Sequence, residues 1–196
     1  MAQRIYEIKR KTLIKYSRKD TPERASKADT LSYSFDDFYI KDLKENYDAT
    51  FLGTVIGGAR PHKTVITIHQ ILENVRQYLL VNDKRIEDLR NNDGVSIIAQ
   101  AVKENDLEVY CDCEDFQYRF AYTATLKGYN IKSKPEKRPA SVRNPYNKGA
   151  LCKHVLNTFK YNTFIRRGSA QFLRELKNNE EYYLNQMNLE YPEIEE

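Results

Sequence analysis

Two short pairs of residues, C-x-C and C-x-H, constrain this chain more than any other feature. Cys111 and Cys113 form the first pair in CDCEDF, and Cys152 and His154 form the second in GALCKH, with 38 residues between the pairs. The chain has three cysteines, so they cannot all pair with one another. The cysteines could form a disulfide, bind a metal or act as a nucleophile.

The two pairs together contain the ligands that structural zinc requires. Thiolate sulfur and imidazole nitrogen bind Zn²⁺ in groups of four at tetrahedral geometry. Both pairs can face one point if the first lies where a strand end turns sharply and the second where a helix starts. Closing the intervening loop costs on the order of 3 kcal/mol, whereas zinc binding contributes roughly 10–16 kcal/mol. The long spacer is therefore compatible with a zinc site.

The competing uses explain fewer of these residues. The N-terminus has charges where a signal peptide needs an apolar block, and a reducing compartment disfavours disulfides between closely spaced thiols. A nucleophilic pair of Cys152 and His154 would leave Cys111 and Cys113 without a role. Four protein ligands also leave no open position for a catalytic water on zinc. We expect a structural site in a protein that is not an enzyme.

The residues around both pairs resemble the SWIM zinc finger, whose pattern is C-x-C, a spacer and C-x-H. An acidic-aromatic step follows the second cysteine in CDCEDF, and a lysine separates the last cysteine from the histidine in GALCKHVL. The resemblance implies Zn²⁺ as the cofactor, and it implies these ligands: Cys111, Cys113, Cys152 and His154.

A narrower resemblance concerns the spacer. DFQYRFAYTATLKG, followed by RNPYNKGALCKHV, is similar to the SWIM variant in virion structural proteins of tailed bacteriophages, which has a helix after the cysteines and an Asn-Pro turn before the last pair. It extends over residues 109 to 160 or so. The similarity implies a connector, neck or tail-ring component that is assembled in the host cytoplasm and located in the virion. Its partners would be copies of itself, in a ring-like oligomer, and other virion proteins.

SWIM domains also occur in DNA-associated proteins, so a DNA- or RNA-binding zinc-finger protein is the alternative. A membrane partner is not expected, because no run approaches the roughly 18 apolar residues of a membrane span. A nucleic-acid binder should lose affinity steeply with salt, whereas a ring subunit should associate with itself.

Charge is distributed unevenly along the chain although the net charge is only +4. Residues 1–27 hold nine Lys or Arg against three acidic residues, and residues 127–148 hold seven against one Glu. The last 18 residues have six Glu and no Lys or Arg. Basic segments attract phosphates, but a basic segment and an acidic tail can equally meet on neighbouring copies. The candidate anion- or partner-binding residues are Lys132, Lys134, Lys137, Arg138, Arg143 and Lys148.

The length and a composition of 40% hydrophobic and 31% charged residues are those of a globular chain. We predict an α+β, helix-rich single domain with an embedded SWIM-like zinc module. Residues 1–100 form an aromatic-rich N-terminal region with helices packed on the core. Residues 101–168 form the zinc module with a long basic insertion at 127–148, and residues 169–196 form a C-terminal helix and an acidic tail.

Local patterns place the ligand pairs on regular elements. DLEVYCDC is typical of a strand that leads into the first pair, and EDFQYRFAYTATLKG predicts a helix closed by Gly128. CKHVLNTFKYNTFIRRG predicts a second helix that stops at Gly168, and a last helix begins at Ser169. KSKPEKRPASVRNPYNKG, rich in proline and basic residues, predicts a loop.

The patterns before residue 104 are less regular. Helical spacing in HKTVITIHQILENVRQYL predicts a helix from about Thr67, although TVITI alone would suit a strand. NNDGVSIIAQAVKEN predicts a helix capped by Asp93. GTVIGGARPHK lacks a phosphate-binding pattern and predicts a turn, and we expect surface or packing roles for His62 and His69. The first 60 residues show no sustained period.

Overall fold

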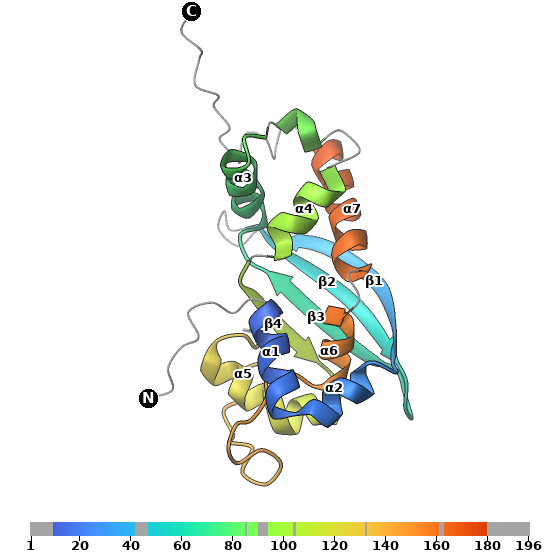
Figure 1. The fold of residues 1–196 in the computed structure, drawn as a ribbon, viewed down its shortest axis with the longest axis vertical. Helices are drawn as coiled ribbons and strands as arrows, with labels where there is room; N and C mark the ends of the chain where they lie inside the picture. The colour runs from blue at the N-terminus through green and yellow to red at the C-terminus, as the bar shows by residue number, and fades with distance from the viewer. Residues whose placement is uncertain are drawn as a thin grey trace, which may run out of the picture.

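The computed structural model describes residues 10–41, 47–84, 86–89, 94–103, 105–131, 133–160 and 163–179. Across these ranges it has seven α-helices and one four-stranded antiparallel sheet, which form a single small domain (Figure 1). This confirms the predicted α+β class. Among the described helices, none is long and apolar enough to span a bilayer.

The sheet has the strand order β1-β2-β3-β4, in which every strand neighbours the one before it in the chain. Its strands are β1 (Ser32–Lys41), β2 (Asp48–Ile56), β3 (His62–Ile68) and β4 (Leu107–Cys111). Alternate residues along a strand point to opposite faces. One cross-strand row is fully apolar and at most 6% exposed, and the adjacent row on the other face is mostly polar. The apolar row consists of Phe38, Phe51, Ile66 and Val109.

Helices cover the apolar face of the sheet. α6 (Lys153–Lys160) contacts all four strands, and α7 (Thr163–Asn178) contacts β1 and β2. Phe164 and Phe172 of α7 stack edge-on against Phe51 and Phe38. α4 (Gly94–Lys103) packs on α7, on α3 (Ile71–Val81) and on the short 3-10 turn η1 (Ile86–Leu89). This end of the molecule is held by apolar packing.

The helix predicted to end at Gly168 is divided differently in the structure. α6 ends at Lys160, and α7 begins at Thr163 and continues through Gly168 to Asn178. A Cβ atom at Gly168 would collide with the ring of Phe51. Glycine is therefore needed inside this helix so that α7 can approach β2 closely, and the prediction that it stops the helix was wrong.

The helix predicted from about Thr67 begins later, at Ile71. Residues up to Ile68 belong to β3, which pairs with β2 on one side and β4 on the other. Pairing on both sides satisfies the backbone of TVITI as a strand, and this tertiary context overrides the helical spacing. The turn predicted in GTVIGGARPHK joins β2 to β3, and the predicted helix after residue 93 is α4; Asp93 itself lies outside the described residues.

The N-terminal basic run is built into the fold over its described part. α1 (Arg10–Asp20) and α2 (Pro22–Ala28) form a corner that packs against α6. Arg10 donates through Nε to the carbonyl oxygen of Phe159 at 3.0 Å, and burial lowers the pKa of its guanidinium. Asn157 donates to the carbonyl oxygens of Ala28 and Leu31, each at 2.8 Å. These contacts fix α1 and α2 against the helix that follows Cys152.

Candidate metal centre

The first cysteine pair lies where the last strand turns into a helix. Cys111 ends β4, as predicted, and the amide of Asp112 still donates to the carbonyl oxygen of Lys63 at 3.2 Å. The amide of Phe116 donates to Cys113 Sγ at 3.2 Å. A π-helical segment η2 (Phe116–Phe120) and α5 (Ala121–Lys127) follow, and Gly128 ends the helix at φ 83°. The helix was predicted and its π-helical turn was not.

The second pair lies at the start of α6. The carbonyl oxygen of Cys152 accepts from the amide of Leu156 at 3.1 Å, so Cys152 occupies the helix-capping position and His154 lies in the first turn. α1 holds the chain that leads to it, because Leu151 N donates to Ser17 Oγ at 3.0 Å and Gly149 N donates to Asp20 Oδ2 at 3.1 Å. Cys152 is therefore positioned by α1 as well as by α6.

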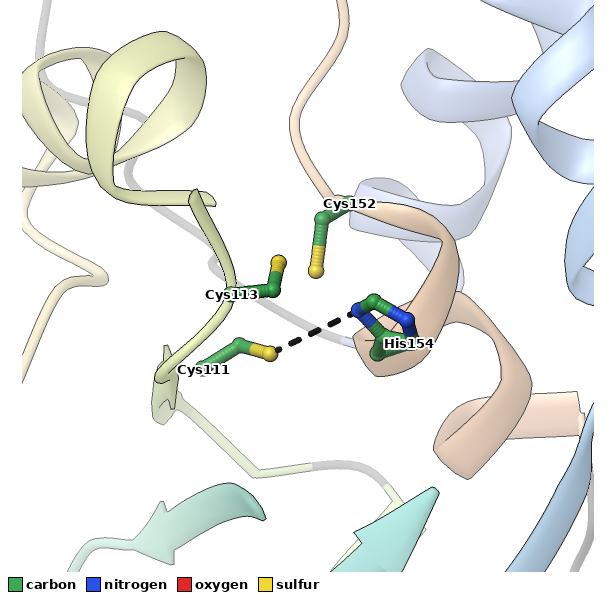
Figure 2. A group of neighbouring side chains, drawn as sticks. All are labelled: Cys111, Cys113, Cys152 and His154. Atoms are coloured by element: carbon green, nitrogen blue, oxygen red, sulfur yellow. Dashed lines mark hydrogen bonds between the residues drawn. The ribbon is translucent and has the colours of Figure 1, made fainter. Parts of the chain in front are cut away.

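The four side chains of the two pairs point toward one another (Figure 2). Their potential ligand atoms all lie within 4.8 Å of one another, and Cys111 Sγ is 3.8 Å from His154 Nδ1. Tetrahedral zinc, with bonds of about 2.0–2.3 Å, places its ligand atoms about 3.5–3.8 Å apart. Each of the four residues is at most 2% exposed. This Cys3His cluster could hold a metal ion, and it is the one such group of His, Cys, Asp or Glu in the described part of the chain.

The thiols of the cluster cannot all ionise by themselves. Hydrogen bonds from the Cys111 and Cys152 thiols lower the pKa of Cys113. Donation to Cys113 raises the pKa of Cys111, and burial raises that of Cys152. Helix starts at Cys113 and Cys152 favour negative charge there. A divalent cation would provide the remaining positive charge needed for three thiolates.

The donor set fits zinc better than it fits other common ions. Three sulfurs and one imidazole nitrogen suit a soft, tetrahedral ion, whereas Mg²⁺ and Ca²⁺ prefer oxygen ligands. All three cysteines are free thiols, so the structure contains no disulfide that would compete. The buried His154 Nε2 has no hydrogen-bond partner within the described residues, while Nδ1 faces the cysteines. The cluster is complete as a set of four ligands and closed to solvent.

A second histidine covers the imidazole of the cluster. The His62 ring lies 4.3 Å from the His154 ring, centroid to centroid, at an interplanar angle of 36°. His62 Nδ1 is 3.0 Å from Asp112 Oδ1, and the same oxygen accepts from the amide of Lys63 at 3.1 Å. His62 therefore has the packing role that was predicted. The sequence did not indicate which ring His62 packs on. The one available signal was Asp112, the partner of His62, because it stands between the two cysteines.

His69 lies in a different cluster at the other end of β3. Its Nδ1 is 2.9 Å from Asp48 Oδ2 and its Nε2 is 3.4 Å from Glu108 Oε1. The hydrogen bond to Glu108 and that to Asp48 raise the pKa of His69. Both carboxylates are 6% exposed, and the group borders a cavity of about 300 Å³ on the outer face of the sheet. This Asp-His-Glu cluster was not predicted.

The predicted loop is confirmed, since the described residues between Gly128 and Cys152 form no helix and no strand longer than one bridge. Its described basic residues lie in different surroundings. Lys134 Nζ lies 4.2 Å above the ring of Tyr110, and Arg138 pairs with Glu136 at 2.8 Å. The bonds from Arg138 lower the pKa of Glu136 to about 2. Lys137 is exposed, and Lys132 lies outside the described residues.

Two of the predicted basic residues do share a groove. Arg143 and Lys148 border a hollow of about 400 Å³ against the corner between α1 and α2. Arg24 and Arg119 line the same groove and were missed by the sequence analysis. They are distant from the loop in sequence, and only the fold brings the three segments together.

No protein-family model, curated protein or solved structure matches this chain. The geometry therefore defines the class by itself: a small α+β domain with a buried Cys3His cluster that could hold a metal ion.

Proposed function

We propose that the Cys3His cluster binds one structural Zn²⁺ and that the chain is a non-enzymatic structural subunit of SWIM type. The observation that carries this proposal is the closed cluster, in which four potential ligands converge and each is at most 2% exposed. A zinc ion with four protein ligands has no open position for a substrate or a water. Its role is then to hold the fold together.

The position of the cluster explains what zinc would hold. Cys111 and Cys113 belong to the end of the sheet, whereas Cys152 and His154 belong to α6, the helix that contacts all four strands. Zinc would join these elements and close the long loop between them. A loop of this length otherwise opposes folding through its closure entropy.

The finer part of the proposal is a virion component of a tailed bacteriophage, of connector, neck or tail-ring type. The sequence resemblance of the spacer supports it, and so does the helical segment after the cysteines. In the Asn-Pro turn before the last pair, Asn144 donates to the carbonyl oxygens of Arg119 at 3.2 Å and Lys148 at 3.0 Å. The expected partners are other copies of the chain and other virion proteins, with assembly in the host cytoplasm.

Sedimentation velocity on the zinc-loaded protein tests this function. We expect self-association that grows with protein concentration and is unchanged by added DNA. A protein that stays monomeric at all concentrations, and binds DNA or RNA with an affinity that falls steeply with salt, would contradict the structural role.

The second candidate is a nucleic-acid-binding SWIM protein, and one observation favours it. Tyr146 is 80% exposed beside Lys148, and Tyr118 is 53% exposed beside Arg143. Proteins bind single-stranded nucleic acids with aromatic rings that stack on bases and nearby cations that contact phosphates. The same sedimentation experiment separates the two candidates.

A further inference from the structure

The groove at the basic loop contains two kinds of cationic side chain, those paired with a carboxylate and those lying against tyrosine rings. Arg24 and Arg119 both face the carboxylate of Asp115, at 3.0 and 3.1 Å. Arg143 and Lys148 lie instead against tyrosine rings, 5.4 Å from the centroid of Tyr118 and 5.7 Å from that of Tyr146. Their charges are available at the surface. Asp20 and Glu23 also line the groove, so its basic character depends on Arg143 and Lys148.

The loop presents apolar surface together with these cations. Val142 is 90% exposed and Tyr146 is 80% exposed, two of the three largest values among the exposed large hydrophobic residues described. The loop is nevertheless held firmly, because Asn144 is only 7% exposed and its side chain makes three hydrogen bonds to the backbone. A fixed loop with exposed apolar and cationic side chains is suited to an acidic partner that also carries apolar residues.

The chain itself contains a segment with that chemistry. Residues 180–196, EEYYLNQMNLEYPEIEE, have six Glu, no Lys or Arg, and tyrosine, leucine, methionine and isoleucine between the charges. α7, which leads to this segment, ends at Asn178 at one end of the molecule, and the basic loop lies at the opposite end (Figure 1). A complementary groove at the end of the molecule opposite to the end of α7 favours contact between copies in a head-to-tail arrangement, which closes into rings or continues as filaments.

We propose that residues 180–196 of one copy bind the groove formed by Arg143, Lys148 and Tyr146 on the next copy. This interface rests on the self-association in the proposed function and names the surfaces responsible. Its charge pairs are exposed, so the association weakens as salt is added.

Two full-length, zinc-loaded variants test the interface. The loop variant carries Arg143→Glu and Lys148→Glu, and the tail variant carries Glu190→Lys, Glu193→Lys, Glu195→Lys and Glu196→Lys. We expect each variant alone to associate on the order of a hundredfold more weakly than the wild type, because like charges then face each other. Mixed together, they should associate again, because the intact tail of the loop variant can pair with the intact groove of the tail variant, and the reversed tail with the reversed groove.

Two further proteins complete the test. A charge-swapped chain that carries both sets of substitutions should associate again. Lys137→Glu, which changes an exposed basic residue outside the groove, should assemble like the wild type. Zinc content and melting temperature, measured on every variant, show that the fold is intact.

The outcomes separate this interface from the function on which it rests. Assembly of both variants at wild-type strength overturns the interface and leaves a self-associating structural subunit in place. A monomeric wild type overturns both. A third outcome would favour nucleic acid. In it, the wild type binds a single-stranded oligonucleotide, the loop variant loses this binding, and the tail variant assembles like the wild type. This result overturns the interface.

Discussion

The two histidine clusters at the ends of β3 differ in what completes them. In the Asp-His-Glu cluster, both ring nitrogens of His69 face carboxylates, so the imidazole has a partner within the chain at each nitrogen. In the Cys3His cluster, three buried thiols meet one imidazole in an arrangement that could hold a metal ion. The first cluster pairs its groups within the chain, whereas the second, in our proposal, takes up an ion. A histidine therefore indicates a metal site when its neighbours are thiols, as for His154, and not when they are carboxylates that it can pair with, as for His69.

The largest expected effect is the loss of a cluster ligand. Cys111→Ser removes one of four ligands, and zinc binding contributes roughly 10–16 kcal/mol, comparable with the whole stability of a typical domain, about 5–15 kcal/mol. We expect a low folding yield, a lower melting temperature and less than one zinc per chain by elemental analysis. Glu114→Gln, at an exposed neighbouring residue, should keep its zinc. Unchanged melting and metal content in Cys111→Ser would remove the distinction between the two clusters.

A smaller effect is expected from the self-contained cluster. His69→Gln leaves Asp48 and Glu108 without the imidazole that they share, and loss of such charged hydrogen bonds costs about 1.5–3 kcal/mol. Chemical denaturation should show this destabilisation while the zinc content stays at the wild-type value. Loss of zinc from His69→Gln would mean that the two clusters depend on each other.

A third prediction concerns the ring that covers the Cys3His cluster. Replacing His62 with Ala uncovers the His154 imidazole, and outer partners of metal ligands change metal affinity by about 10–100-fold. Zinc release to a chelator should become faster by that order. His62→Phe keeps a ring in place and should restore slow release if packing matters more than the bond to Asp112. Equal release rates in the wild type and the Ala variant would show that His62 has no such role.

The smallest expected effect is a dependence of stability on pH. The pKa of His69 is raised above its ordinary value of 6.5, so its contribution is fully present below pH 6.5 and is lost as pH rises through the folded-state pKa. The metal cluster has the opposite sign, because acid protonates its ligands and releases zinc. Denaturation curves across about pH 6–9 should show an alkaline decline that His69→Gln abolishes. An alkaline decline that persists in His69→Gln would assign it to other groups.

The Cys3His cluster could be predicted because its residues form two local pairs. In C-x-C and C-x-H the paired side chains stand two residues apart, so a strand end and a helix start suffice to aim them, and both elements have clear local patterns. The Asp-His-Glu cluster has no such signature. Asp48, His69 and Glu108 come from three different segments and meet only through strand pairing.

The errors in the predicted elements have the same origin. TVITI fits a helical spacing until β2 and β4 pair with it on both sides, and Gly168 resembles a helix stop until the ring of Phe51 fills the space beside it. Arg24 of α2 and Arg119 of η2 were missed for a similar reason, since only the fold brings these elements and the loop together around the groove. Local patterns predict elements, and contacts between elements decide their limits.

Native mass spectrometry of the purified protein, recorded with and without a strong chelator, tests whether zinc holds this fold together. We expect one zinc per chain, and on chelation the loss of that mass together with a shift to the high charge states of an unfolded chain. A chain that carries no metal, or one whose charge-state distribution is the same after the metal is removed, would contradict a zinc-stabilised fold.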